Sequence, residues 1–156
     1  MATTWNCSDA KTCFEWTETY AIGFGQIDRE HQRLFALAEA MQLAMMAGKG
    51  KAFLGTLLAA LLDYAGYHFA HEEALMERLG YPALPEHRRQ HDALRTRVRE
   101  LQKRADSGEI TMTMEVAAFL IDWLKRHTTD EDRKIATHRG GAKSPRPGDE
   151  NDTRGE

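Results

Sequence analysis

Histidine and carboxylate side chains recur at helical spacing in this sequence, a pattern that is typical of metal sites. His68 precedes Glu72 by four residues, and His87 precedes His91 by four residues. On an α-helix this spacing places both side chains on one face, one turn apart, where both can reach one buried point. His31 stands at the head of another apolar stripe. We therefore expect a metal centre inside a helical core.

A fourth stretch offers His127 and Asp132, which are five residues apart. A separation of five exceeds one turn of α-helix, so the two side chains do not share one face of a regular helix. Both can join the same centre only if the helix is distorted between them or if the aspartate reaches across. The full set of predicted ligands is His31, His68, Glu72, His87, His91, His127 and Asp132.

The case for a metal rests on five histidines and two carboxylates that all face the interior of the four predicted helices. A single such pair is common on ordinary helices. A lone buried histidine is usually a hydrogen-bonded core residue. An unpartnered buried polar group costs a few kcal/mol, whereas a whole domain is stable by only about 5–15 kcal/mol. Seven ligands exceed the positions of one tetrahedral ion, so two ions bridged by carboxylates fit. Imidazole-rich sites suit iron, zinc, copper or nickel, and residue types alone do not choose among them.

Four amphipathic stretches must position these side chains. Apolar residues at helical spacing predict helices over about 28–47, 51–79, 85–105 and 111–137. Asp28 is the expected N-cap of the first helix, and Gly48, Gly80 and Gly108 mark the ends of the first three. Short connections between four such helices predict an all-α, up-down-up-down four-helix bundle.

The two ends of the chain differ from this middle part. Residues 1–26 carry five aromatic side chains and two glycines, which predicts an ordered N-terminal arm packed across the bundle. Residues 27–138 form the predicted bundle. Residues 139–156 contain glycine, proline and charged residues but no large apolar side chain, so we expect a disordered C-terminal tail.

Composition excludes several classes of protein. The net charge of −3 does not favour nucleic acid, and the longest apolar run, 52–62, is too short to span a membrane. The start of the chain lacks a basic stretch followed by an apolar one, so no secretory signal is expected. Cys7 and Cys13 do not have zinc or redox spacing and are expected to be free thiols. We expect a cytoplasmic monomer and leave an unidentified protein partner open.

Four segments of the chain resemble the hemerythrins, specifically the single-domain bacterial ones. The segments are residues 27–31 (IDREH), 68–73 (HFAHEE), 87–91 (HRRQH) and 123–127 (WLKRH) running on to Asp132. Each segment alone is a weak signal, but all four in order at suitable separations are highly specific. The resemblance covers residues from about Phe14 to Arg139.

The resemblance implies a centre of two iron ions that binds dioxygen. One ion would be held by three histidines, which are His87, His91 and His127. The other would be held by His31 and His68 and would keep an open position for dioxygen. Glu72 and Asp132 would bridge the ions together with a solvent-derived oxo or hydroxo group. The spacing of five between His127 and Asp132 is the spacing that the family itself shows.

The resemblance also implies an apolar oxygen pocket lined by Phe69, Trp123, Leu124 and Thr128. Thr128 departs from the family, in which an aliphatic residue usually follows this histidine. A hydroxyl there could admit water or donate a hydrogen bond to bound oxygen. We therefore predict that the oxygenated form decays faster than it does in the variant Thr128→Ile.

Reversible dioxygen binding, in storage, delivery or sensing, is the function that this resemblance implies. The alternatives are a di-iron enzyme with peroxidase, oxidase or nitric-oxide chemistry, and a metal-storage protein. Seven protein ligands leave the ions more saturated than carboxylate-rich oxygenase sites do, so we predict that the protein is not an enzyme.

His71 is expected beside the site without ligating, and His138 is expected in solvent. The arginine-rich third helix is expected to present a solvated face offset by acidic neighbours.

Overall fold

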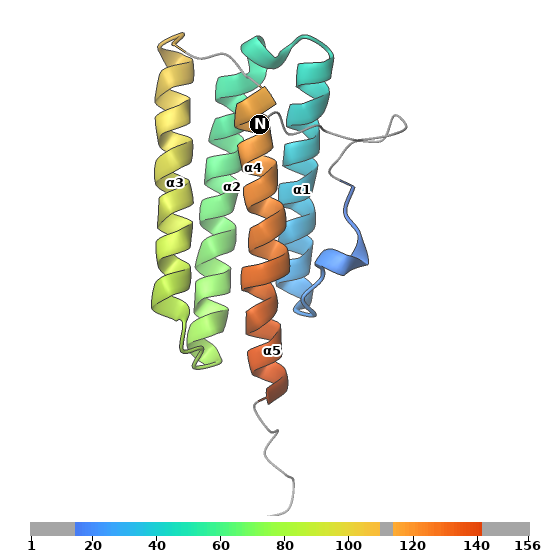
Figure 1. The fold of residues 1–156 in the computed structure, drawn as a ribbon, viewed down its shortest axis with the longest axis vertical. Coiled ribbons are helices and arrows are strands. Elements are labelled where there is room, and N and C mark those ends of the chain that lie inside the picture. Colours follow the sequence, from blue (N-terminus) through green and yellow to red (C-terminus); the bar gives the residue numbers. More distant parts are fainter. Residues whose placement is uncertain (1–14, 110–113, 142–156) are drawn as a thin grey trace, which may run out of the picture.

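The protein is described by a computed structural model that covers residues 15–109 and 114–141 (Figure 1). A short 3₁₀-helix, η1, spans Glu18–Tyr20 and precedes the bundle. The helices are α1 (Gly25–Met46), α2 (Gly50–Arg78), α3 (Leu84–Asp106) and α4 (Met114–Arg126). The π-helix η2 (His127–Asp132) and α5 (Arg133–Gly141) continue α4 as one column. The described residues contain no strand, and the predicted all-α up-down-up-down bundle is confirmed.

Three glycines end the first three helices as predicted. Gly48, Gly80 and Gly108 have φ values of 68°, 59° and 73°, in the left-handed region that favours glycine. In each case the N–H of the next residue donates to the carbonyl five residues earlier, at 2.8–2.9 Å. This closure satisfies carbonyl groups that the helix end would otherwise leave unpaired.

The predicted N-cap of the first helix is wrong. Helix α1 begins at Gly25 with Phe24 as its N-cap, so Asp28 lies within the first turn. The Asp28 carboxylate instead accepts hydrogen bonds from the backbone N–H groups of Ile22 at 2.7 Å and Gly23 at 3.0 Å. Asp28 therefore fixes the chain that leads into α1.

The last helical column extends further toward the C-terminus and is less regular than predicted. It starts at Met114 and runs to Gly141, so residues 139–141, expected in the tail, are helical. The rest of the predicted tail and the first part of the arm, with Cys7 and Cys13, lie outside the described residues. None of the described helices has the length and apolar character needed to cross a bilayer.

Residues 15–24 lie along α1. The Trp16 ring meets Phe35 edge-on at 5.4 Å between centroids, and Tyr20 lies 4.6 Å from the same ring. The Arg133 guanidinium at the start of α5 donates to the carbonyl oxygen of Thr19. Together these contacts join the segment before α1 to α1 itself and to the start of α5.

Surface arginines of α3 are matched by carboxylates, as the sequence predicts. Arg95 pairs with Asp92 at 2.7 Å, and Arg97 pairs with Glu100 at 3.4 Å. Arg88 binds Glu73 at 3.1 Å. The charged face of α3 is therefore locally neutralised rather than being a free cationic surface.

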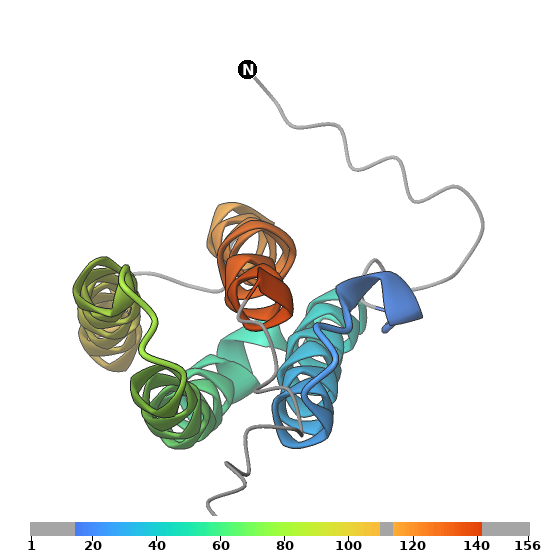
Figure 2. The same ribbon diagram turned by 90° about the horizontal axis from the view of Figure 1, so that it is seen from below.

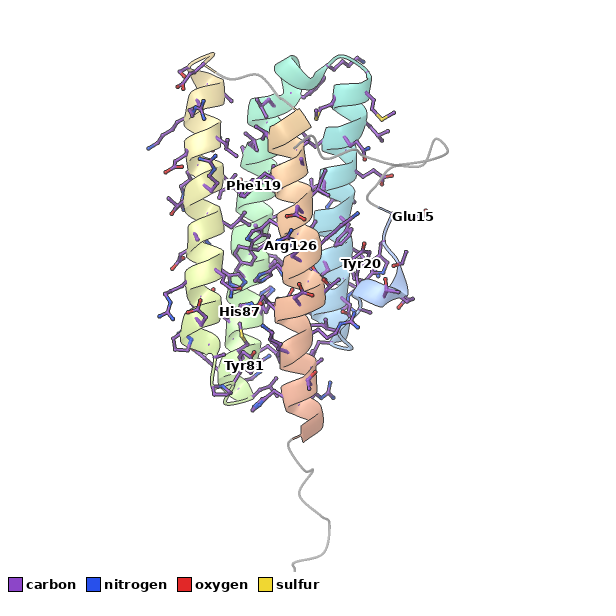
Figure 3. All side chains as sticks on the ribbon, in the orientation of Figure 1. Glu15, Tyr20, Tyr81, His87, Phe119 and Arg126 are labelled. Carbon is purple, nitrogen blue, oxygen red and sulfur yellow. The ribbon has the colours of Figure 1, made fainter. Side chains whose placement is uncertain are left out.

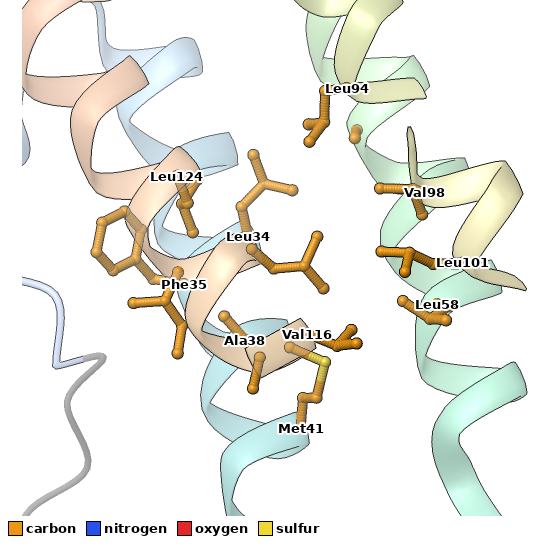
Figure 4. Packing of buried hydrophobic residues seen from close by; sticks show 14 of the residues in the cluster. Leu34, Phe35, Ala38, Met41, Leu58, Leu94, Val98, Leu101, Val116 and Leu124 are labelled. Atoms are coloured by element: carbon orange, nitrogen blue, oxygen red, sulfur yellow. The ribbon is translucent and has the colours of Figure 1, made fainter. Parts of the chain in front are cut away.

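Apolar residues fill one half of the bundle, and the predicted ligands lie in the other half. Helix α1 packs against α2 and α4, and α2 packs against α3 (Figure 2). Neighbouring helices run in opposite directions, so apolar residues after His31 face apolar residues before His68, and the same order holds for α3 and α4. The buried cluster includes Leu34, Phe35, Ala38, Met41, Leu58, Leu94, Val98, Leu101, Val116 and Leu124 (Figure 4).

Candidate metal centre

All seven predicted ligands meet at one buried place. Their exposed fractions are between 0 and 5%. They form two groups that share Glu72, and within each group the ligand atoms lie within 4.8 Å of one another. The first group is Glu72, His87, His91 and His127, and the second is His31, His68, Glu72 and Asp132.

The two carboxylates each present one oxygen to each group. Glu72 Oε2 lies 3.2 Å from Nε2 of both His87 and His91, whereas its Oε1 lies 3.9 Å from His31 Nε2. Asp132 Oδ1 lies 3.0 Å from His127 Nε2, and its Oδ2 lies 3.1 Å from His31 Nε2. This is the arrangement required of carboxylates that bridge two ions.

The π-helix η2 explains the spacing of five that a regular helix could not accommodate. It spans His127–Asp132, so the two ligands are its first and last residues. A π-helix closes its hydrogen bonds from residue i to i+5, and such segments are frequent at functional sites. The wider turn brings both side chains to one face. Of the two possibilities that the sequence left open, the structure therefore shows the distorted helix.

Burial and neighbouring groups shift the pKa values of several candidate ligands. Burial and the nearby Asp132 both raise the pKa of Glu72, but hydrogen bonds from His87 and His91 outweigh them and hold that pKa at about 2. Burial also opposes ionisation of Asp132, but the charge of the nearby His127 lowers its pKa well below the usual range. Burial lowers the pKa of His87, whereas the nearby carboxylates of Asp132 and Glu72 raise it to about 9. Two carboxylates thus stay ionised in a buried site and require positive charge beside them.

Buried nitrogen and oxygen atoms that lack a hydrogen-bond partner test whether a metal fits these residues. Buried side-chain atoms without a hydrogen-bond partner are rare in folded proteins. Among the described residues, such atoms include both ring nitrogens of His31, Oε1 of Glu72 and both carboxylate oxygens of Asp132. Nitrogen and oxygen atoms of this kind are the donors that transition metals take. The orphaned atoms fit a pair of ions between the two groups.

Glu30 is a functional residue that the sequence analysis missed. Its side chain is 5% exposed, and its Oε2 accepts a hydrogen bond from His68 Nδ1 at 3.0 Å. Its Oε1 lies 2.7 Å from His71 Nδ1. Burial raises the pKa of Glu30, but hydrogen bonds from His68, His71 and Gln26 lower it overall. The one available signal was a carboxylate on the apolar stripe of α1, one residue before His31.

Glu73 does for His91 what Glu30 does for His68. Glu73 Oε1 accepts from His91 Nδ1 at 2.9 Å and is itself held by Arg88. A carboxylate on Nδ1 fixes the orientation of the ring and leaves Nε2 to face the centre. His71 stays outside both groups of ligands, as expected.

His138 does not stand free in solvent, contrary to our expectation. It is half-buried, and its Nε2 lies 3.1 Å from the carbonyl oxygen of Leu79 at the end of α2. Its ring also meets Tyr81 edge-on at 5.5 Å. The continuation of α5 past residue 137 carries His138 to this place, which is a contact between helix ends.

Three of the four predicted pocket residues line one apolar cavity of about 30 Å³; these are Phe69, Trp123 and Leu124. Phe69 lies flat on His91 at 3.7 Å, and Trp123 lies flat on His127 at 4.3 Å. Both aromatic rings therefore cover the three-histidine group rather than His31 and His68. Thr128 is buried but does not line this cavity, and its hydroxyl donates to the carbonyl oxygen of Leu124 at 2.8 Å.

Removing the Glu30 carboxylate should weaken the centre without removing any ligand. We expect Glu30→Gln to lower metal affinity about 10- to 100-fold, because carboxylates that orient ligating histidines contribute about that much. Competition with a chelator at known concentration measures the change. His71→Asn is the matched control, since His71 touches Glu30 but no other part of the site, and it should lose much less affinity. Equal affinities in Glu30→Gln and the unaltered protein would contradict this role.

Comparison with known proteins agrees with this geometry. Residues 23–138 match the model of the hemerythrin HHE cation binding domain. The bacteriohemerythrin of Stenotrophomonas maltophilia is 32% identical over 121 residues, which are 78% of each chain. That of Clostridium acetobutylicum is 28% identical and covers 78% of this chain and 97% of its own. A crystal structure of wild-type hemerythrin superposes with a TM-score of 0.70 at 28% identity, covering 81% of this chain and 97% of that one. The chain belongs to the hemerythrin family.

Proposed function

We propose that the protein binds dioxygen reversibly at two iron ions held between its four helices. The observation that carries the proposal is the placement of Glu72 and Asp132, each with one oxygen toward each group of histidines. Two iron ions, when bound, supply the electrons that reversible attachment of dioxygen requires. The family to which the chain belongs supports iron as the metal.

The chain's own residues would hold the ions and control their surroundings. His87, His91 and His127 would bind one ion, and His31 and His68 the other. The two bridging carboxylates offset part of the positive charge inside the bundle, which reduces the electrostatic cost of burying it. Their low pKa values keep both ionised at neutral pH.

Apolar side chains would exclude water from the centre. The cavity beside Phe69, Trp123 and Leu124 has about 30 Å³ of room, whereas a single water needs roughly 10–15 Å³ by the same measure. It is therefore wide enough for a diatomic molecule. Its apolar walls offer water no hydrogen-bond partners, which favours dioxygen over water inside it.

An enzyme is the second candidate, and the described site offers it little support. Carriers of oxygen need no proton donor beyond the centre, whereas peroxidase or oxidase chemistry needs a placed acid or base. Glu30 and Glu73, the carboxylates next to the ligands, are both engaged by ligand histidines. The cytoplasmic location and the monomeric state remain predictions.

Anaerobic reduction followed by addition of oxygen tests the proposal. The reduced protein with two irons per chain should be nearly colourless, gain a visible absorption band with oxygen and lose it when oxygen is removed. Irreversible oxidation with turnover of hydrogen peroxide would favour the enzyme instead. A colourless protein with two zinc ions would contradict both and favour metal storage.

Thr128 should shorten the lifetime of the oxygenated form. The Thr128 hydroxyl already donates its proton to the carbonyl of Leu124, so it does not donate to bound oxygen. The prediction therefore rests on the lone pairs of the Thr128 oxygen, which would attract water beside the ligands. We expect Thr128→Ile to autoxidise several-fold more slowly, measured as decay of the visible band in air. Thr128→Val is the matched variant, because it removes the hydroxyl and keeps the shape. Equal decay rates in all three proteins would refute a role for the hydroxyl.

A further inference from the structure

A groove of about 410 Å³ opens on the surface between α3 and the column formed by α4 and η2. Phe119 and Trp123 line it from α4, and Ala93 lines it from α3. His127 also lines the groove and is the least buried of the seven candidate ligands, at 5% exposure. Figure 3 labels Phe119 and Arg126 on this stretch of α4. The groove therefore reaches from solvent to the edge of the metal centre.

One wall of the groove is aromatic. Phe119 and Trp123 are four residues apart and so lie one above the other on α4. The Phe119 ring is 37% exposed, and the Arg97 guanidinium lies over it at 5.9 Å from the centroid. Trp123 is half-buried, with its indole flat on the His127 ring at 12° between planes. The small side chain of Ala93 on α3 leaves room for a flat molecule beside this wall.

The groove also has a negative charge. Asp122, Asp130 and Glu131 line it, and Arg126, the one arginine among the lining residues, pairs with Asp122 at 3.1 Å. The Arg97 guanidinium over Phe119 is paired with Glu100 at 3.4 Å. Glu131 is paired with Lys134 at 2.8 Å, whereas Asp130 is exposed and lies 3.3 Å from the hydroxyl of Thr129. Among the described residues, Asp130 is thus the lining carboxylate for which no ion pair with lysine or arginine is found, and its charge repels anions and attracts cations.

We propose that this groove is a binding site for a small planar aromatic molecule that is uncharged or positively charged. The volume lies within the range of about 300–1,000 Å³ found for small-molecule sites and suits two or three fused rings. The ring packs beside Phe119 and Trp123, and any positive group points toward Asp130. Phosphorylated or sulfonated aromatics are disfavoured by the carboxylates. Because Trp123 rests on His127, an occupant of the groove contacts the layer that covers the metal centre.

Fluorescence titration of the metal-loaded protein with a matched pair of probes tests the proposal. The probes are the 9-aminoacridine cation and the acridine-9-carboxylate anion, which share one ring system. We expect the cation to bind at least about tenfold more tightly at low ionic strength, and this preference to shrink in high salt. Asp130→Asn should reduce the preference. Equal affinity for the two probes would overturn the charge argument and the proposal with it.

Phe119→Ala should weaken binding of the cation about five- to tenfold, which is the effect expected for the loss of one aromatic contact. Phe53→Ala is the matched control, because Phe53 is also an exposed phenylalanine, at 47% against 37% for Phe119, and it does not line the groove. Both rings are on the surface, so neither change should alter the melting temperature. Equal affinities of the two variants would overturn the proposal. The measurement does not depend on oxygen binding, so either proposal can fail without the other.

Discussion

Replacing Glu72 with alanine is expected to abolish retention of the second metal ion and to lower overall metal affinity by more than about 100-fold. Loss of a residue that only orients a ligand costs about 10- to 100-fold, and Glu72 is shared by both groups of ligands. The variant also leaves His87 and His91 without their common acceptor in a fully buried place. Metal content per chain after treatment with a chelator measures the effect, and thermal unfolding measures its consequence for the bundle.

Glu77→Ala is the matched control for this change. Glu77 lies on the same helix five residues later, but its side chain is 57% exposed and binds Arg88 at the surface. Surface ion pairs contribute about 0–1 kcal/mol, so the control should keep its metal and nearly all of its stability. A metal content of two in Glu72→Ala would refute the bridging assignment, whatever happened to the melting temperature.

The metal-free protein is expected to lose stability as the pH rises from about 6.5 to 9, and the loaded protein is not. The pKa of His87 is raised from 6.5 to about 9 in the folded state. A raised pKa means that the proton stabilises the fold below pH 6.5 and that this contribution is lost as the pH rises through 9. The shift corresponds to roughly 3 kcal/mol. His31 has a raised pKa too and adds to the same loss.

Acid should also destabilise the metal-free protein, through Glu72. Its pKa falls from 4.5 to about 2 on folding, so its contribution is present above pH 4.5 and is lost as the pH falls toward 2. Burial lowers the pKa of His91, so charging that ring costs stability below pH 6.5. The metal-free protein is therefore expected to be most stable near the upper part of the interval from 4.5 to 6.5.

Urea unfolding at several pH values, with and without chelator, measures the loss of stability at both high and low pH. Metal binds only the deprotonated imidazoles, so bound metal replaces the protons and removes the loss of stability at high pH. His87→Gln in the metal-free form should reduce the loss of stability at high pH, because it removes the imidazole whose pKa is raised to about 9. A metal-free protein that is equally stable at pH 6 and pH 9 would contradict the electrostatic description of the site.

The carboxylates that accept hydrogen bonds from the candidate ligand histidines could not be predicted from the spacing of residues along one helix. Glu30 and His68 are 38 residues apart and meet because α1 and α2 pack at one particular rotation and axial offset. Those two quantities depend on how all the core side chains interdigitate, and helical periodicity carries no information about them. The same holds for Glu73 and His91. The bond from the Thr128 hydroxyl to the carbonyl of Leu124 is different, because it joins residues four apart in one helical column and is local.

The sequence by itself determined the four helices, their glycine ends and the seven candidate ligands, because polar residues at a helical period inside an apolar stripe identify both the helix and the buried face. It also indicated that the helix is distorted between His127 and Asp132 or that the aspartate reaches across. Only the tertiary structure decided that the distortion is a π-helix, that each carboxylate turns one oxygen to each group, and that an aromatic groove remains between α3 and α4. These features arise from contacts between helices, whose energies depend on side chains far apart in the chain.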